Sequence, residues 1–141
     1  MLFRSGIDVE PVTRDIVSLL PEFATTEEAE LLRPLSDEDA SAATRLWCAK
    51  EAMAKARGTG LQGRPKEFGV LEIEANGDFL LCHRVDGERR VVHTELVGPF
   101  VLAYTSVSDR IFGDNVEPGA SATGAEIWAP TLPAQRIKRA S

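Results

Sequence analysis

The segment LWCAKEAMAKARGTGL, from Leu46 to Leu61, is the part of this chain from which its architecture can be built outward. It consists mainly of the good helix formers Ala, Met, Leu, Lys, Arg and Glu, and no β-branched residue occurs before Gly58. Gly58 is expected to end the helix, because glycine adopts the left-handed conformation after a last turn at little steric cost. The segment therefore predicts a helix that stops at Gly58.

Three residues of this helix recur every four positions and share one face: Trp47, Glu51 and Lys55. Lys50 flanks that face. On spacing alone, Glu51 and Lys55 are equally well explained as a surface ion pair, which stabilises an exposed helix by only about 0.2–0.5 kcal/mol.

Two further acids occur near the N-terminus, in the segment GIDVE from Gly6 to Glu10. In a strand, Asp8 and Glu10 point to the same side, and we expect Ile7 and Val9 to face the opposite way, towards a core. Adjacent carboxylates repel each other, and Mg²⁺, which prefers oxygen ligands, would relieve that repulsion. Taken alone, the same pattern also fits a solvated strand end with two unrelated acids.

Together, GIDVE and WCAKEAMAKARGTGL resemble the paired signature of the 4′-phosphopantetheinyl transferases. The intervening FATTE, from Phe23 to Glu27, is similar to the segment that precedes the helix in that family. The resemblance extends from about Leu2 to Phe68. It implies transfer of the 4′-phosphopantetheine arm of coenzyme A to a serine of an apo acyl or peptidyl carrier protein, with release of 3′,5′-ADP.

The resemblance also implies a magnesium cofactor held by carboxylates. Asp8, Glu10 and Glu51 would hold Mg²⁺ against the coenzyme A pyrophosphate, with Glu27 as a further candidate, and the metal would act as a Lewis acid. Glu51, or a water that it polarises, would take the proton of the attacking serine. We favour the water, because a metal-bound carboxylate is a poor base.

Other residues are expected to contact the two substrates. Lys55, and also Lys50, would pair with phosphate oxygens. Gly58 and Gly60 would let the backbone approach the nucleotide, although a helix stop followed by a turn explains both glycines as well. Arg14 matches an arginine that helps hold the carrier protein in the family, and a solvated surface arginine is the alternative.

Composition sets the outer limits of these expectations. The 141 residues suffice for one domain with a core. No apolar run approaches the roughly 20 residues of a membrane span, and no signal-peptide pattern opens the chain. Cys48 and Cys82 lack metal-ligand spacing and are expected to be buried reduced thiols, which suits a cytoplasmic protein. The net charge of −6 argues against nucleic acid as a partner, and an acidic carrier protein would require a local basic patch.

Hydrophobic periodicity and turn signals predict an α+β fold, in which one long helix packs on an antiparallel β-meander and forms a 4′-phosphopantetheinyl transferase-like half. Asn76-Gly77 and Asp86-Gly87 are strong hairpin signals. His83 and His93 lie in the predicted strands and are expected to be structural or surface residues rather than bases.

We expect a domain over residues 1–112 and a Gly/Pro/Ala-rich tail over 113–141. The predicted elements are a strand over 2–9, short helices over 13–20 (closed by Pro21) and 27–32, a long helix from the cap Ser36 to Gly58, and strands over 68–75, 78–85, 88–96 and 99–107.

The chain carries one copy of the signature, whereas larger family members hold two similar halves and form the site between them. The missing coenzyme A contacts would come from other subunits of a homotrimer or from a second half-domain, and the chain could also be a domain of a larger synthase. Two other functions remain open. One is a docking module that binds a carrier protein without catalysis, and the other is a Mg²⁺-dependent phosphohydrolase.

Overall fold

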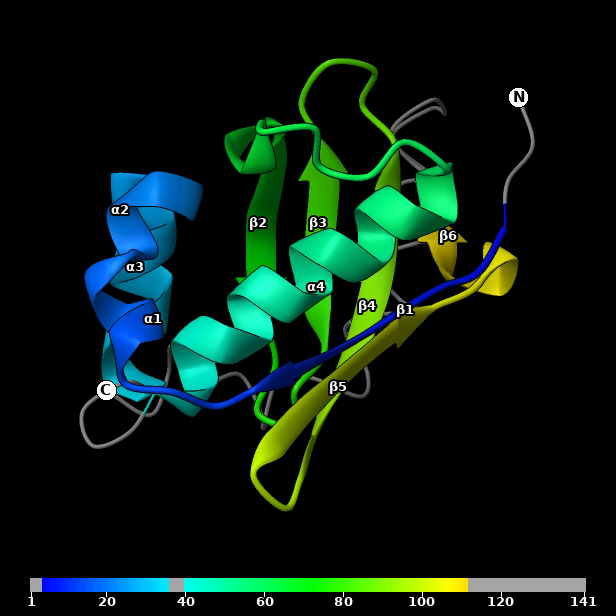
Figure 1. Ribbon diagram of the computed structural model, residues 1–141. Helices are drawn as coiled ribbons and strands as arrows, with labels where there is room; N and C mark the ends of the chain where they lie inside the picture. Colours follow the sequence, from blue (N-terminus) through cyan, green and yellow to red (C-terminus); the bar gives the residue numbers. More distant parts are fainter. Residues whose placement is uncertain (1–3, 36–39, 112–141) are drawn as a thin grey trace.

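An antiparallel sheet forms one layer of the molecule, and helix α4 (Ser41–Arg57) lies across one face of it (Figure 1). This computed structural model describes residues 4–35 and 40–111. The strand order in the sheet is β1-β5-β4-β3-β2, and β6 pairs with β4. The mixed helix and antiparallel sheet agrees with the α+β prediction. The strands are β1 (Gly6–Pro11), β2 (Phe68–Ile73), β3 (Phe79–His83), β4 (Arg89–Val97), β5 (Phe100–Thr105) and β6 (Arg110–Ile111).

Strands β2 to β5 follow one another as the predicted meander, because glycines make their turns possible. Gly77 and Gly87 have φ angles of 98° and 80°, in the left-handed region that favours glycine. The backbone N–H of Asp78 donates to the side-chain oxygen of Asn76 at 3.0 Å and closes the first of these turns. Both predicted hairpin turns are therefore confirmed.

Helix α4 ends where the sequence predicts and begins later than expected. Gly58 follows its last residue with φ 80°, and its N–H donates to the carbonyl oxygen of Lys55 at 2.9 Å. The first helical residue is Ser41, and Ala40 occupies the N-cap position. The predicted cap Ser36 lies in 36–39, outside the described residues.

Short helices connect β1 to α4: α1 (Asp15–Ser18), α2 (Leu20–Phe23) and α3 (Thr26–Leu32). The prediction of one helix over 13–20 closed by Pro21 is wrong. Pro21 instead lies in the first turn of α2, where a missing N–H is tolerated. The helix predicted over 27–32 is confirmed as α3. The 3-10 turns are Arg33–Leu35, Pro65–Glu67 and Val107–Asp109.

Strand β1 packs directly against α4, and glycine at position 6 makes this possible. A Cβ atom on Gly6 would lie 2.0 Å from the carbonyl oxygen of Ala52 and 2.6 Å from the backbone nitrogen of Ala56. The strand pairs with β5 in antiparallel register, with Asp8 opposite Ala103. A larger residue at position 6 would push β1 away from the helix.

The two faces of β1 are the reverse of the expected ones. Asp8 and Glu10 share a face, as predicted, but that face is covered, whereas Ile7 and Val9 are exposed. The prediction that Ile7 and Val9 face the core is wrong, because α4 packs on the side of Gly6 and Asp8. The core lies between α4 and the inner face of the sheet and includes Leu46, Met53, Phe68, Phe79, Leu81, Val92 and Val101.

In the part of the chain that the structure describes, we find no helix with the length and apolar character needed to cross a membrane.

Candidate functional site

The predicted acids and lysine meet where β1 crosses the middle of α4. Asp8 is buried on the inner face of β1, and one of its oxygens, Oδ1, accepts a hydrogen bond from Lys55 Nζ at 2.7 Å. Its other oxygen, Oδ2, is buried and, with the neighbouring carboxylate ionised, has no hydrogen-bond partner among the described residues. A buried carboxylate oxygen without a partner costs free energy and is a natural point for a ligand to bind.

Glu10 and Glu51 stand close enough to Asp8 for the three carboxylates to affect one another. Burial raises the pKa of Glu10 to about 7, with smaller contributions from contact with Asp8 and from the charges of Asp8 and Glu51. Burial and then the charge of Asp8 raise the pKa of Glu51. The pKa of Lys55 is raised, chiefly by its hydrogen bond to Asp8. The cluster of Asp8, Glu10, Glu51 and Lys55 therefore holds more negative charge than its one lysine neutralises.

The predicted stripe on α4 borders this cluster. Trp47 and Glu51 are half-buried and Lys55 is exposed, so this face of the helix is open to solvent beside β1. Trp47 packs edge-to-face against Phe23 with 5.2 Å between ring centroids. This contact joins α4 to the short helix α2.

A family model described as the 4′-phosphopantetheinyl transferase superfamily matches residues 4–105. The chain belongs to this superfamily. No curated protein matches it. The match runs from before β1 to the end of β5, so it includes every element that brings Asp8, Glu51 and Lys55 together.

Phosphopantetheinyl transferases typically use Mg²⁺, and the donor set in this chain fits that ion. The described residues include no group of three His, Cys, Asp or Glu side chains that could hold a metal by themselves. Mg²⁺ keeps several waters and is commonly held by one or two carboxylates together with substrate phosphates, so it needs no closed protein cage. The unpartnered Oδ2 of Asp8 and the raised pKa of Glu10 both indicate that a cation would be favourable at this cluster.

Lys50 occupies a different environment from the one predicted. Its ammonium is fully buried and donates to Glu28 Oε1 at 2.9 Å and to the carbonyl oxygen of Phe23 at 2.6 Å. Burial lowers its pKa. The structure thus contradicts the prediction that Lys50 pairs with coenzyme A phosphates, because the side chain points into the protein and joins α4 to α2 and α3.

The partner of Lys50 is a residue that the sequence analysis missed. Glu28 is buried, and its carboxylate also accepts from the backbone N–H groups of Thr25 and Val70 and from Arg84. The side chain of Thr25 accepts from Glu28 N–H in return, which makes a capping box at the start of α3. The pattern Thr25-x-x-Glu28 is the sequence signature of this box and could have identified Glu28.

Glu27, the further metal candidate, is exposed at the start of α3. Within the described residues it forms no hydrogen bond or ion pair, and in particular none to the cluster at Asp8. The structure therefore brings Asp8, Glu10 and Glu51 together and leaves Glu27 apart from their hydrogen-bonded contacts.

The remaining predicted residues lie at the ends of elements. Arg14 is exposed at the N-cap position of α1. Gly58 is the C-cap of α4, and a Cβ there would meet the side chain of Arg4 at 2.5 Å. Gly60 has φ 66°, and a Cβ there would meet nothing within 4 Å, so the backbone at this point is open to approach.

The thiol of Cys48 lies against the cluster of carboxylates and donates to the backbone carbonyl oxygen of Asp8 at 3.2 Å, whereas Cys82 and His93 have other partners. Cys48 is buried and Cys82 half-buried, and both are free thiols. His93 is held between Asp78 and Asp109, at 3.0 and 2.9 Å from its two ring nitrogens.

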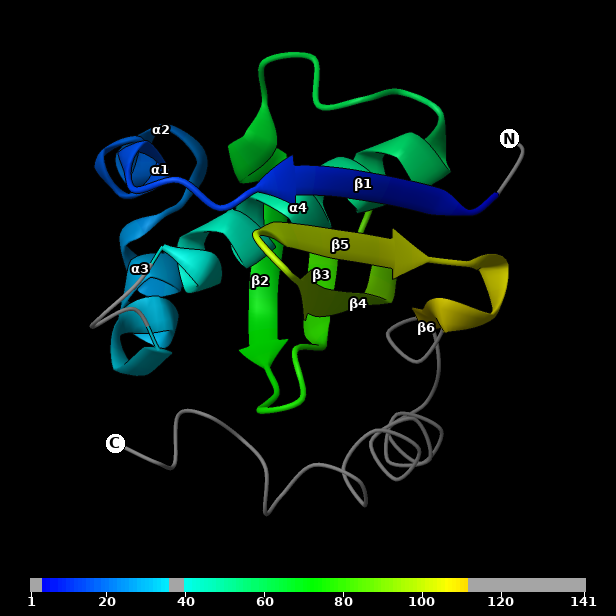
Figure 2. The same cartoon turned by 60° about the horizontal axis from the view of Figure 1, so that its bottom comes forward.

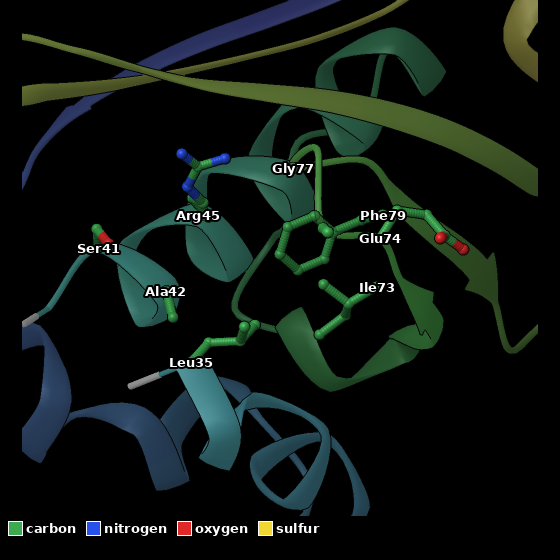
Figure 3. A pocket seen from close by; sticks show the side chains of 9 residues that line it. Leu35, Ser41, Ala42, Arg45, Ile73, Glu74, Gly77 and Phe79 are labelled. Atoms are coloured by element: carbon green, nitrogen blue, oxygen red, sulfur yellow. The ribbon is translucent and has the colours of Figure 1, made fainter. Parts of the chain in front are cut away.

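Two hollows lie away from the carboxylate cluster. One of about 190 Å³ lies between α4 and the β2–β3 hairpin, where Leu35, Arg45 and Phe79 surround it (Figure 3). Arg45 there donates to Thr94 Oγ1 at 2.9 Å. Because Leu35 and Ser41 at its rim flank residues 36–39, which the structure does not describe, we assign it no ligand.

The second hollow, of about 420 Å³, opens between α2 and the turn Pro65–Glu67 and carries three basic side chains. Arg84 is engaged by Glu28, whereas Lys66 is exposed and has no ion-pair partner in the described part of the chain. We call this hollow the basic cleft. It is lined by Pro21, Glu22, Gly63, Arg64, Pro65, Lys66, Glu67 and Arg84.

Proposed function

We propose that this chain transfers the 4′-phosphopantetheine arm of coenzyme A to a serine of an apo acyl or peptidyl carrier protein. The serine oxygen forms a new bond to the phosphorus that carries the pantetheine, the pyrophosphate bond breaks, and 3′,5′-ADP leaves. Membership of the superfamily supports phosphopantetheine transfer in general. The observation that carries the proposal for this chain is the meeting of Asp8, Glu10, Glu51 and Lys55 at one point of the fold.

In this proposal Asp8, Glu10 and Glu51 hold Mg²⁺, and Glu27 stays a further candidate. When bound, Mg²⁺ supplies positive charge that stabilises the leaving 3′,5′-ADP. The side chain of Lys55 is half exposed, so its ammonium can turn from Asp8 towards a phosphate oxygen when the carboxylate gains another cationic partner. The open backbone at Gly60 would border the path of the nucleotide, and Gly58, which the side chain of Arg4 covers, stays a further candidate for this contact.

The proton of the carrier serine goes to Glu51 or, as we favour, to a water that Glu51 orients. A half-buried carboxylate with a raised pKa accepts a proton more readily than an ordinary glutamate, and this supports either role. Arg14 and the basic side chains of the basic cleft would contact the acidic surface of the carrier protein. They would supply the local positive charge that a chain with net charge −6 needs for such a partner.

The proposal also includes the assembly and location of the enzyme. We expect a homotrimer or a pairing with a second half-domain. The carboxylate cluster offers one lysine, whereas coenzyme A carries several phosphates, so the other positive charges would come from a neighbouring subunit or half-domain. We place the enzyme in the cytoplasm, in keeping with its two free cysteines.

One experiment tests the transfer directly. The protein is incubated with coenzyme A, Mg²⁺ and an apo carrier protein, and the carrier is weighed by mass spectrometry. A gain of one phosphopantetheine arm is expected. A carrier that binds but gains no mass would show a docking module, and release of phosphate from coenzyme A without carrier modification would show a phosphohydrolase. Either of these results would overturn the proposal.

A further inference from the structure

Arg4, two residues before β1, places an exposed guanidinium against the C-terminal end of α4. A Cβ atom on Gly58, the C-cap of α4, would lie 2.5 Å from Nη2 of Arg4, 3.2 Å from its Cζ and 3.4 Å from its Nε. Figure 1 and Figure 2 both show the start of β1 beside this end of α4. Arg4 therefore adds a cation at the end of the helix that carries Glu51 and Lys55.

The guanidinium of Arg4 has no acidic partner within residues 4–35 and 40–111. The acids nearest to it along the chain's contacts are already engaged, because Asp86 binds Arg57, the last residue of α4, at 2.7 Å. Glu88 accepts from three arginines: Arg57, Arg90 and Arg110. The charge of Arg4 is thus available to an anionic ligand.

The backbone of Arg4 is fixed although its side chain is exposed. Its carbonyl oxygen accepts a hydrogen bond at 3.2 Å from the fully buried Arg90. Arg90 also donates to the carbonyl oxygen of Ser106 at 3.0 Å and to Glu88 at 2.9 Å. Because these bonds use the backbone of Arg4, a substitution at this position removes the guanidinium and keeps the anchor of the strand.

The opposite directions of β1 and α4 align Arg4 with the carboxylate cluster. The backbone carbonyl oxygen of Asp8 accepts from Cys48 at 3.2 Å, near the start of α4, whereas Arg4 lies at Gly58, after its end. Four residues of extended chain place the Cα atoms of Arg4 and Asp8 about 13 Å apart. Lys55 binds Asp8 and precedes Gly58 by about one helical turn. Arg4 thus lies beyond Lys55, on the side of the loop that follows α4.

We infer that Arg4 binds the 3′-phosphate of coenzyme A and makes this chain discriminate against dephospho-coenzyme A. The inference rests on the proposed function, in which Mg²⁺ and Lys55 hold the pyrophosphate and the open backbone at Gly60 borders the nucleotide. The 3′-phosphate is attached to the ribose, on the nucleotide side of the pyrophosphate, and Arg4 lies on that side of Lys55. A guanidinium presents two parallel N–H donors that match the oxygens of a phosphate.

The competing explanation for Arg4 is structural, because a cation near the end of a helix interacts favourably with its last carbonyl groups. That end of α4 already carries Lys55 and Arg57 in its last turn. Its carbonyl groups also accept from the backbone N–H groups of Gly58 and Gly60. The helix end is therefore capped without Arg4. A purely structural role would affect the binding of all nucleotides alike, and this difference can be measured.

Titration calorimetry on the full-length chain with Mg²⁺ tests the inference with 3′,5′-ADP and adenosine 5′-monophosphate, which differ only in the 3′-phosphate. The wild-type chain is expected to bind 3′,5′-ADP about 10-fold more tightly, as a charge-assisted hydrogen bond typically provides. Arg4→Met should remove most of this preference and leave the affinity for adenosine 5′-monophosphate unchanged. Arg4→Lys should keep part of it. Arg33→Met is the control, because Arg33 is an exposed arginine that lies before α4 in the chain, and it should keep the wild-type preference.

Transfer kinetics give the same comparison with complete substrates. In Arg4→Met the KM for coenzyme A should rise about 10-fold, while kcat and the KM for dephospho-coenzyme A stay near wild type. Arg4→Gln keeps the test valid if Arg4→Met does not fold.

A wild-type chain that binds neither nucleotide, or both equally, overturns the inference. A preference that Arg4→Met or Arg4→Gln retains, or an equal loss of affinity for both nucleotides, also overturns it. A preference that depends on Arg4 in a chain without transfer activity would refute the proposed function alone. Transfer with equal use of coenzyme A and dephospho-coenzyme A would refute the role of Arg4 alone.

Discussion

Lys55 Nζ lies 2.7 Å from Asp8 Oδ1 and so joins the middle of the sequence signature on α4 to its beginning on β1. The two residues are 47 positions apart in sequence. Their contact brings the half-exposed ammonium to a buried carboxylate whose second oxygen, while Glu10 is ionised, has no partner among the described residues. Removal of single charges at and around this ion pair should therefore change the rate of transfer much more than the free energy of unfolding.

Glu51→Gln should abolish transfer and leave the fold intact. Glutamine has nearly the same shape as glutamate but carries no negative charge, so it can neither hold a cation as a carboxylate does nor accept the proton of the carrier serine. We therefore expect the rate of transfer to fall by about 10²-fold or more. Removal of one of three repelling carboxylates should keep the free energy of unfolding within about 0.5 kcal/mol of wild type. Carrier mass spectrometry and urea unfolding measure the two effects. Glu30→Gln, at an exposed position on α3, is the control, and near-normal transfer by Glu51→Gln would refute the metal assignment.

Lys55→Met should raise the KM for coenzyme A more than it changes stability. The ion pair with Asp8 is half exposed at the lysine, so its loss should cost about 0–1 kcal/mol. Lys55→Arg keeps the positive charge and should retain part of the affinity, although its planar head group places that charge differently. Kinetics at varied coenzyme A concentration measure the effect. An unchanged KM in Lys55→Met would remove Lys55 from the substrate site.

Lys50→Met should destabilise the protein and leave the KM for coenzyme A of the folded enzyme unchanged. The substitution leaves the carboxylate of Glu28 buried without its ammonium partner, which typically costs about 3–5 kcal/mol. The double variant Glu28→Gln with Lys50→Met removes both charges and should recover part of that loss. Urea unfolding and coenzyme A kinetics separate this structural role from the phosphate contact that the sequence suggested, which would raise the KM at little cost in stability.

His93 should make the protein less stable at alkaline pH. Its hydrogen bond to Asp78, together with the bond to Asp109, raises its pKa to about 9. Because the folded-state pKa is raised, the contribution to stability is fully present below the ordinary value of 6.5 and is lost as pH rises through about 9. Since the ring is partly exposed, we expect the loss to be about 1–2 kcal/mol.

The measurement for His93 is the free energy of unfolding at about pH 6 and about pH 9.5. His93→Gln keeps hydrogen-bonding capacity without a titrating ring, so the difference between wild type and variant isolates the histidine from other groups that titrate in the same range. A difference that does not change between these two pH values would contradict the assignment.

Features that depend on neighbouring residues in the chain were predictable from the sequence. The helix stop at Gly58, the two hairpin turns and the common face of Asp8 and Glu10 follow from local conformational preferences and strand geometry, and the structure confirms them. The same local rules predicted that Pro21 ends a helix, and this was wrong, because a proline also fits the first turn of a new helix.

Features that depend on distant packing were not predictable. Alternation along β1 defines two faces but does not say which of them α4 covers, and the usual assignment of apolar residues to the core gave the wrong answer for Ile7 and Val9. In the same way, helix spacing could not show that Lys50 turns inward, because its partner Glu28 lies on a different helix.

Gly6→Ala should separate β1 from α4 and thereby disable the carboxylate cluster. The added methyl would lie 2.0 Å from the carbonyl oxygen of Ala52, and that backbone atom cannot move aside as a flexible side chain would. We expect a loss of about 1–3 kcal/mol of stability from overpacking, together with a loss of transfer, because the shift of β1 carries Asp8 away from Glu51. Urea unfolding and carrier mass spectrometry measure both effects. Gly98→Ala provides a comparison, since a Cβ there meets nothing within 4 Å even though the left-handed φ of 59° adds strain. It should therefore lose stability while it retains transfer, and the same result for Gly6→Ala would mean that the close packing of β1 on α4 does not position the cluster.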